Sequence, residues 1–263
     1  MHPSAAANLL RDTAHSFRER AYTPFSGQSV AAVFLCEDGV MVPGVRVESA
    51  SFSLSLPALL NAFTTAVSTG RRHAILGVAL TRPLSAADEA YLRMLVGIPL
   101  EPAANDVWLR GGGTREVPEP SDVVDPRLPL DPDLSPNNGV KHARDAAMQA
   151  LVPSSDFRVG TVLETPGGDF FPGANVEHPD WARILCAERN AAGTARTFGH
   201  SAARRLFLTC LDDDQGSPCG ACRQVLAELT PDAVLWMDRH DAPAERTTPE
   251  ALLPGFFQGQ SLM

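Results

Sequence analysis

Three cysteines and one glutamate in the second half of the chain have the residue types and the spacing of a metal-dependent catalytic site. Cys186 stands two residues before Glu188, and further along the chain Cys219 and Cys222 form a Cys-x-x-Cys pair. Three protein ligands with one open position are typical of catalytic zinc, whereas a structural zinc site is closed by four ligands. Glu188 follows the first cysteine too closely to be a comfortable fourth ligand, so we expect it beside the open position.

A closed structural zinc site is the alternative to this interpretation. It needs a fourth Cys or His at ligand spacing, and the nearest histidines, His178 and His200, flank the motif without completing it. The order Cys-x-Glu followed by Pro-Cys-x-x-Cys is instead the pattern of zinc-dependent nucleobase deaminases. We therefore expect one zinc ion per chain, with Cys186, Cys219 and Cys222 as its protein ligands.

The chemistry that this pattern predicts is hydrolytic deamination. A bound zinc ion lowers the pKa of a water ligand to about 7. Glu188 can then take a proton from this water, pass it to a ring nitrogen of the substrate and protonate the exocyclic amine, which leaves as ammonia. Arg189 is expected to draw negative charge off the sulfur atoms, and a solvent-facing helix residue is the alternative interpretation of this position.

The chain contains an internal repeat that defines its domain organisation. At a fixed offset of 129 residues, Pro43-Gly44 falls on Pro172-Gly173, Val47-Glu48 on Val176-Glu177, and Asn61-Ala62 on Asn190-Ala191. Chance matches would be scattered over the chain, whereas these gather in one stretch. We therefore expect two similar domains, residues 1–134 and 135–263.

The first domain lacks the residues that the chemistry needs. In the same register Pro57 replaces Cys186 and Leu59 replaces Glu188, and neither replacement binds zinc or transfers a proton. We therefore predict that residues 1–134 form a degenerate, non-catalytic copy of the deaminase-like domain, which is kept for packing against the catalytic domain.

Hydrophobic periodicity and turn residues predict a similar order of elements in both halves. Helices are expected over residues 4–20, 57–67, 85–95, 140–151, 186–198 and 219–229, and strands over 29–36, 40–47, 73–81, 106–110, 158–163, 170–176, 204–211 and 233–238. A hairpin followed by alternating helices and strands predicts an α/β fold with a mixed central sheet between helices, a three-layer sandwich that is duplicated in the chain.

The composition argues against a protein that acts on nucleic acid. The net charge is -9 and aromatic residues make up 6% of the chain, whereas polynucleotide editing would need a basic groove and aromatic platforms. No apolar run reaches the length of a membrane span, and the N-terminus lacks the basic region and apolar core of a signal peptide. Because metal-bound thiolates suit a reducing compartment, we expect a cytoplasmic protein with Cys36 and Cys210 as buried free thiols.

The motifs described above resemble those of the cytidine deaminase family. The resemblance is carried by Pro153–Gly160, Gly173–Glu177, Cys186–Ala191, Pro218–Gln224 and Leu252–Phe257. It implies the cytidine deaminase fold and a free small-molecule nucleoside as substrate. The implied reaction is the hydrolysis of cytidine or deoxycytidine to uridine or deoxyuridine, with release of ammonia, in pyrimidine salvage.

By position, the resemblance also implies three substrate-binding residues. Asn175 and Glu177 would hydrogen-bond the sugar hydroxyls, and Phe157 would contact the pyrimidine ring. The side chains of Asn175 and Glu177 project to the same side of a strand, which suits a pair of neighbouring hydroxyls. The alternatives are turn capping at a strand end for Asn175 and Glu177, and a plain core position for Phe157.

The resemblance is incomplete at His178–Trp181, where the family usually has Asn-Ala-Ser-Tyr. In the family this segment lies near the sugar and near subunit contacts, so the alternative substrate is a modified cytosine nucleoside such as a nucleoside antibiotic. A non-enzymatic zinc-binding module is a further alternative, and the open ligand position beside Glu188 argues against it.

The repeat and the resemblance together predict a homodimer. Single-domain members of the family form tetramers in which neighbouring subunits complete each active site, so two chains with four domains would mimic such a tetramer. Phe257, in the aromatic ending of the chain, would reach toward a neighbouring site. The alternative is a monomer whose two domains merely touch.

Light scattering is expected to give the mass of a dimer, and metal analysis of the same sample one zinc ion per chain, because only the second domain has metal ligands. Residues 135–263 expressed alone are expected to be insoluble, misassembled or much less active. A monomeric full-length chain with full activity, or two zinc ions per chain, would contradict this architecture.

Overall fold

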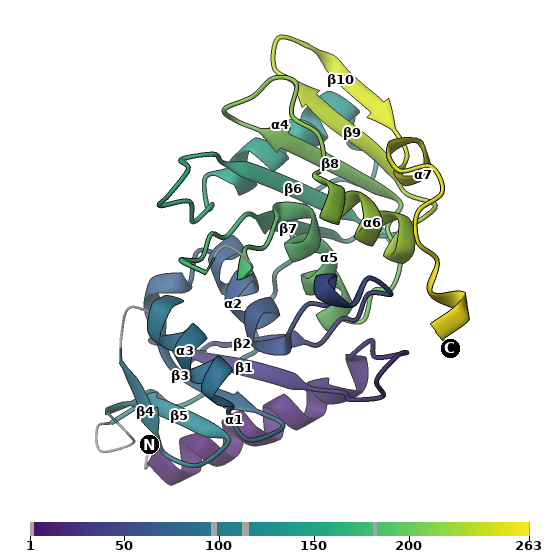
Figure 1. Ribbon diagram of the computed structural model, residues 1–263. Helices are drawn as coiled ribbons and strands as arrows, with labels where there is room; N and C mark the ends of the chain where they lie inside the picture. The colour runs from purple at the N-terminus through teal and green to yellow at the C-terminus, as the bar shows by residue number, and fades with distance from the viewer. Residues whose placement is uncertain (1–2, 96–98, 112–115, 181–182, 263) are drawn as a thin grey trace.

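The computed structural model describes residues 3–95, 99–111, 116–180 and 183–262. The chain forms two five-stranded sheets, one in each half, with helices on their faces. Figure 1 shows helices α2 (Ala58–Ser68) and α5 (Ala187–Thr197) side by side between the two sheets. The expected α/β fold, with its duplicated arrangement of a sheet and flanking helices, is confirmed.

The first sheet has the strand order β2-β1-β3-β5-β4. Strand β1, between β2 and β3, is buried on both faces, because Val33 and Leu35 pack against α1 while Phe34 and Cys36 belong to the core beneath α2. This period of two explains why the strand is apolar throughout. The elements of this half are α1 (Pro3–Phe17), β1 (Ala31–Cys36), β2 (Met41–Val45), α2, β3 (Ile75–Leu80), α3 (Ala86–Leu95), β4 (Leu100–Pro102) and β5 (Val107–Arg110).

The second sheet has the strand order β10-β9-β8-β6-β7. In β6, between β8 and β7, Val162 packs with Val140 of α4 on one face, whereas Leu163 packs with Ala191 of α5 and Leu226 of α6 on the other. The sheet is therefore the middle layer of three. The elements of this half are α4 (Pro136–Ala147), β6 (Val159–Glu164), β7 (Phe170–Ala174), α5, β8 (Arg205–Cys210), α6 (Gly220–Leu229), β9 (Val234–Arg239), β10 (Ala242–Thr247) and α7 (Pro249–Leu252).

The two sheets differ at their outer strands. In the second half β8 and β9 are parallel and are joined through α6, as a crossover between parallel strands requires. In the first half the chain runs from α3 to the edge strand β4 and returns along β5, so every described pairing of this sheet is antiparallel. Within the described residues of the first half, no helix joins two adjacent strands as α6 does.

The structure matches the internal repeat closely around the centre of the molecule. At the offset of 129 residues, α2 coincides with α5 and β2 with β7. Thr65 and Thr194, which are equivalent in this register, hydrogen-bond each other through their hydroxyls at 2.8 Å. Equivalent residues meet in this way on the two-fold axis of a homodimer, so the two halves pack like the subunits of a symmetric pair. The domain boundary between residues 134 and 135 stays a prediction.

The helix expected over residues 140–151 begins and ends one turn earlier, at Pro136 and Ala147. The hydroxyl of Ser135 accepts a hydrogen bond from the backbone N–H of Asn138 at 3.3 Å. Such a cap, followed by proline at the first helical position, is a strong start signal. The expectation was wrong because it followed the apolar residues and not the cap.

Strands β4 and β10 are not predicted by the sequence pattern. The strand over residues 233–238 was expected to be the last, but the chain turns at His240, where φ is 50°, and returns as β10. Most side chains of β10 are exposed, and a polar edge strand shows no apolar alternation.

No helix of the described residues is long and apolar enough to cross a membrane.

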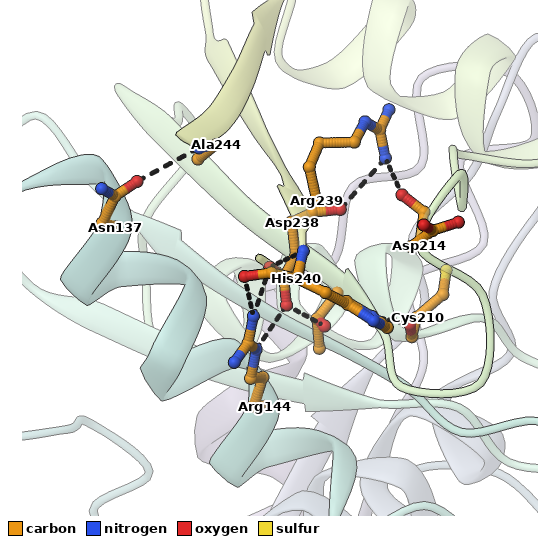
Figure 2. A network of polar contacts seen from close by, with 9 residues as sticks. Asn137, Arg144, Cys210, Asp214, Asp238, Arg239, His240 and Ala244 are labelled. Atoms are coloured by element: carbon orange, nitrogen blue, oxygen red, sulfur yellow. Dashed lines mark hydrogen bonds and ion pairs between the residues drawn. The ribbon is translucent and has the colours of Figure 1, made fainter. Parts of the chain in front are cut away.

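An ion pair between the partly exposed Arg144 and the buried Asp238 fixes α4 to the end of β9 (Figure 2). Arg144 donates from Nε and Nη2 to the two carboxylate oxygens of Asp238, at 2.5 and 2.7 Å. The next residue, Arg239, donates to the backbone carbonyl of Asp214 at 3.2 Å. Because Asp214 lies between β8 and α6, this network holds the loop that leads to Cys219.

The ion pair changes the titration of Asp238. Burial opposes ionisation of this carboxyl, but the hydrogen bonds from Arg144 and Thr209 outweigh it, and the pKa of Asp238 is lowered. A carboxylate with a lowered pKa in the folded state stabilises the fold at pH values above its unfolded pKa of about 4. This contribution is lost as the pH falls through the folded pKa.

The variant Asp238→Asn is expected to lower the free energy of unfolding at pH 7 by about 2 kcal/mol, because it leaves the guanidinium of Arg144 without its carboxylate. The difference from the wild-type chain should shrink as the pH falls well below 4, where both chains lack the charge. Urea denaturation at pH 7 and near pH 3 measures both values. Asp232→Asn, at an exposed carboxylate just before β9, is the matched control, and an equal loss at both pH values would contradict the ion-pair explanation.

Candidate active site

Three cysteine sulfur atoms converge from the beginnings of two helices. Cys186 immediately precedes α5, Cys219 immediately precedes α6, and Cys222 lies in the first turn of α6. The Sγ atoms all lie within 4.8 Å of one another, and those of Cys186 and Cys219 are 3.6 Å apart. Tetrahedral ligands about 2.3 Å from a zinc ion are about 3.8 Å from each other, so the three sulfur atoms fit a zinc ion.

The three thiols differ in acidity. Hydrogen bonds from Cys186 and Cys222, and then from backbone N–H groups at the start of α6, lower the pKa of Cys219. The hydrogen bond with Cys219 raises the pKa of Cys186, those with Cys186 and Cys219 raise the pKa of Cys222, and burial raises both. A metal ion that takes all three sulfur atoms as thiolates therefore displaces the protons of the other two.

Glu188 is a buried carboxyl next to this cluster. It lies in the first turn of α5 and only 3% of its surface is exposed. Burial raises the pKa of Glu188 to about 7, and Oε2 has no hydrogen-bond partner among the described residues. Buried polar atoms are nearly always paired, so the free oxygen indicates that a ligand completes the site. A carboxyl with a pKa near neutrality can both accept and donate a proton.

Arg189 points to the other half of the molecule. Its Nη2 donates to the backbone carbonyl of Leu54 at 2.7 Å, and within the described residues no contact with a cysteine sulfur is found. The guanidinium still acts on the site at a distance, since its charge opposes the rise in the pKa of Glu188. The role expected for Arg189 toward the sulfur atoms stays a prediction.

Asn175 and Glu177 hold the loop that contains Phe157. Asn175 donates from Nδ2 to the carbonyl of Phe157 at 2.9 Å and accepts from the N–H of Val159 at 2.8 Å. Oε2 of Glu177 accepts from the N–H of Ser154 at 2.7 Å. The ring of Phe157 is 38% exposed. These contacts place the three residues together, and their roles toward a substrate stay predictions.

The first half repeats only one of these contacts. Glu48, the equivalent of Glu177, accepts from the N–H groups of Phe25 and Ser26 at 3.0 and 3.1 Å. This contact belongs to the shared scaffold, because it is also present in the half without metal ligands. Asn175 is replaced there by Arg46, which pairs with Glu48 at 2.9 Å.

The segment after Glu177 is packed against the first half. The buried ring of His178 stacks on Tyr91 of α3, with ring centroids 5.0 Å apart and an angle of 7° between the planes. The sequence marks this segment as unusual, but no local pattern identifies Tyr91 as its partner, since the two residues lie in different halves. Trp181 lies outside the described residues.

The C-terminal segment is bound to α6 of the same chain. Gln224 donates from Nε2 to the carbonyl of Phe257 at 2.8 Å and accepts from the N–H of Phe257 at 3.1 Å. The side chain of Phe257 is 51% exposed, so it is accessible to a second molecule. Its predicted contact with a neighbouring site stays a prediction.

A zinc-binding set of three thiols, with a buried glutamate beside it at the helix ends of an α/β sandwich, defines a zinc-dependent hydrolytic deaminase. The family model for the cytidine and deoxycytidylate deaminase zinc-binding region matches residues 136–237. The match thus covers α4 through most of β9, which is the part of the chain that contains all three cysteines and Glu188.

The chain is also similar to individual cytidine deaminases. It is 34% identical over 124 residues to those of Sporosarcina psychrophila and Halalkalibacterium halodurans, which covers 47% of this chain and 91% and 94% of the two relatives. The chain belongs to the cytidine deaminase family. The solved structure of the cytidine deaminase from Burkholderia pseudomallei is 30% identical, with a TM-score of 0.45, and the match covers 47% of this chain and 100% of that one.

Two substitutions are expected to separate metal binding from proton transfer. Cys219→Ala should lose zinc, because it removes one of three thiolates. Glu188→Ala should keep zinc at near one ion per chain and lose about two to four orders of magnitude in turnover. Metal analysis and an ammonia-release assay measure the two effects. Cys36→Ala, at a buried thiol of the first half, is the control for zinc content, and full turnover by Glu188→Ala would remove this residue from the mechanism.

Proposed function

We propose that the chain catalyses the hydrolytic deamination of cytidine and deoxycytidine to uridine and deoxyuridine, with release of ammonia, in pyrimidine salvage. The observation that carries the proposal is the buried, unpartnered oxygen of Glu188 beside three converging thiols. Family membership supports the same reaction, since the relatives that the chain matches are cytidine deaminases.

The proposed mechanism assigns proton transfer to Glu188. Zinc, when bound by Cys186, Cys219 and Cys222, supplies a Lewis acid that lowers the pKa of water in the site. Glu188 takes a proton from that water and delivers it to the ring nitrogen beside the amine-bearing carbon. The hydroxide that remains adds to the amine-bearing carbon. Glu188 then takes the second proton, from the added hydroxyl, and delivers it to the exocyclic amine. The C–N bond breaks and ammonia leaves, so that water and cytidine give uridine and ammonia. Its pKa of about 7 is close to the value that favours both directions of transfer.

The proposed substrate site lies at the loop held by Asn175 and Glu177. We propose that both residues bind the sugar hydroxyls and that Phe157 contacts the pyrimidine. Asn175 is the more specific candidate, because the first half keeps the glutamate at this place but replaces the asparagine by Arg46. The alternative substrate, a modified cytosine nucleoside, is supported by the unusual stacking of His178, which follows Glu177 directly.

We further propose a cytoplasmic homodimer in which residues 1–134 are the degenerate domain and 135–263 the catalytic domain. The pseudo-symmetric contact between Thr65 and Thr194 supports the view that one chain replaces two subunits. Exposed aromatic side chains at Phe52 and Phe257 are available for contacts with a second chain. The five free cysteines, three of them clustered for metal, fit a reducing compartment.

An ammonia-release assay on a panel of cytosine compounds tests the proposed substrate. Cytidine and deoxycytidine should be turned over, and cytosine base should be poor because it lacks the sugar. Glu177→Gln should lower kcat/KM for cytidine by about tenfold to a hundredfold. The effect on 2′,3′-dideoxycytidine should be smaller, because this compound has neither the 2′-hydroxyl nor the 3′-hydroxyl of cytidine.

The matched control is Glu48→Gln, which disturbs the equivalent loop of the first half without touching the proposed substrate site. It should affect stability similarly and leave the ratio of cytidine to dideoxycytidine turnover unchanged. Equal turnover of cytosine and cytidine would show that the sugar assignment is wrong. Preference for a modified nucleoside over cytidine would favour the alternative substrate.

A further inference from the structure

The first half contains a cleft where the second half has its metal site. The cleft has a volume of about 450 Å³, and its lining includes Arg46, Pro57 and Leu59. In the internal repeat these positions correspond to the amide, the first cysteine and the glutamate of the catalytic half. Ligand pockets have volumes of several hundred cubic ångströms, so the first half has a cavity of ligand size without the residues for deamination.

The lining of this cleft is rich in positive charge. Four guanidinium groups line it, Arg46 and Arg82 from the first half and Arg183 and Arg189 from the second, together with one carboxylate, Asp88. The chain as a whole has a net charge of -9. Clustered positive charge in a cavity of an acidic protein favours a ligand with negative charge.

Three of the four guanidinium groups are paired with carboxylates of the protein, and Arg46 pairs with Glu48 at 2.9 Å. Arg82 donates to Asp88 at 2.6 Å and Arg183 donates to Asp180 at 3.0 Å. These ion pairs fix the three side chains at the cleft and neutralise part of the charge. Among the described residues only Arg189 lacks a carboxylate partner, so the excess of positive charge comes from Arg189.

Arg46 and Arg189 use only some of their guanidinium N–H donors in contacts with the protein. A guanidinium has five N–H donors. Arg189 uses Nη2 for the carbonyl of Leu54, and among the described residues no carboxylate pairs with it. Arg46 contacts Glu48 through Nη2 at 2.9 Å. Guanidinium groups with unused donors match the oxygens of a phosphate group, which they bind in pairs of parallel hydrogen bonds.

The remaining lining suits an apolar or planar part of a ligand. Pro57, Leu59 and Leu60 contribute apolar surface. Tyr91 also lines the cleft, and its buried hydroxyl has no hydrogen-bond partner among the described residues. The cleft therefore combines phosphate-type donors with an apolar surface.

We propose that this cleft binds a small phosphate-bearing molecule of nucleotide size. The phosphate lies against Arg46 and Arg189, and the rest of the ligand lies along the apolar lining. Because the cleft is lined by both halves, binding stabilises their packing against each other. The inference does not depend on the proposed deaminase activity, since it concerns a cavity without metal ligands.

Isothermal titration of the zinc-loaded, full-length chain with pyrophosphate, adenosine diphosphate, uridine diphosphate and adenosine tests the inference. Binding of the diphosphates without binding of adenosine is the expected result. Pyrophosphate binding as tightly as the nucleotides would identify the phosphate group alone as the ligand, whereas nucleotides at least tenfold tighter would identify a nucleotide. A bound ligand should also raise the melting temperature by a few degrees. All these measurements are independent of turnover.

Two variants locate the binding in the cleft. The double variant Arg46→Gln, Arg189→Gln should weaken diphosphate binding at least tenfold, and Arg93→Gln, at an exposed arginine of α3, is the matched control. Ser53→Asp adds a negative charge at an exposed position of the lining and should weaken binding in the same direction, even where the double variant folds poorly. Zinc content and circular dichroism monitor folding.

Three outcomes would overturn the inference. The first is no binding of any phosphate compound at millimolar concentration. The second is unchanged binding by the Ser53→Asp variant together with the double variant. The third is a change of the mass measured by light scattering when the arginines are replaced, since this would show that a second chain and not a small molecule occupies the cleft.

Discussion

Three sulfur atoms that repel one another as thiolates have to be held within a few ångströms, although they come from two separate stretches of chain. The sheet solves this problem by directing the beginnings of α5 and α6 toward one place. The parallel pairing of β8 with β9 requires a crossover, and the crossover is α6. The first half has an antiparallel pair at the same position in its sheet, but α3 still begins beside the start of α2, where both line one cleft. The first half therefore lacks the cysteines and not the helix beginnings that could hold them.

Local sequence patterns were sufficient for the cluster of three cysteines and for most of the fold. The cysteine spacing predicted the cluster, and the repeat predicted that α2 and α5 are equivalent. Elements whose signal is not local were missed or misplaced. The edge strand β10 has a polar, exposed pattern because it packs on one neighbour only, and α4 begins at a cap whose strength the apolar pattern does not show.

Contacts between the halves could not be read from the sequence, because they join residues that are far apart along the chain. The sequence connects Arg189 with the sulfur atoms of the site, whereas its hydrogen-bond partner in the structure is the carbonyl of Leu54 in the other half. Tyr91 had no feature that connects it with His178. The repeat did, however, allow one distinction that a single domain would not: Glu48 repeats the loop contact of Glu177, whereas Arg46 does not repeat that of Asn175.

The packing of α2 on α5 has a consequence for how the two halves can change. In a homodimer each surface must fit a copy of itself, so a substitution at the axis appears twice and has to suit both copies. Here Asn61 donates to the carbonyl of Gly193, and a side chain at Gly193 would collide with Asn61. The position equivalent to Gly193 is Thr64, so the close contact of Asn61 with a glycine has no symmetry-related counterpart. Once the two halves share one chain, they need to fit each other but no longer themselves, and each is free to specialise.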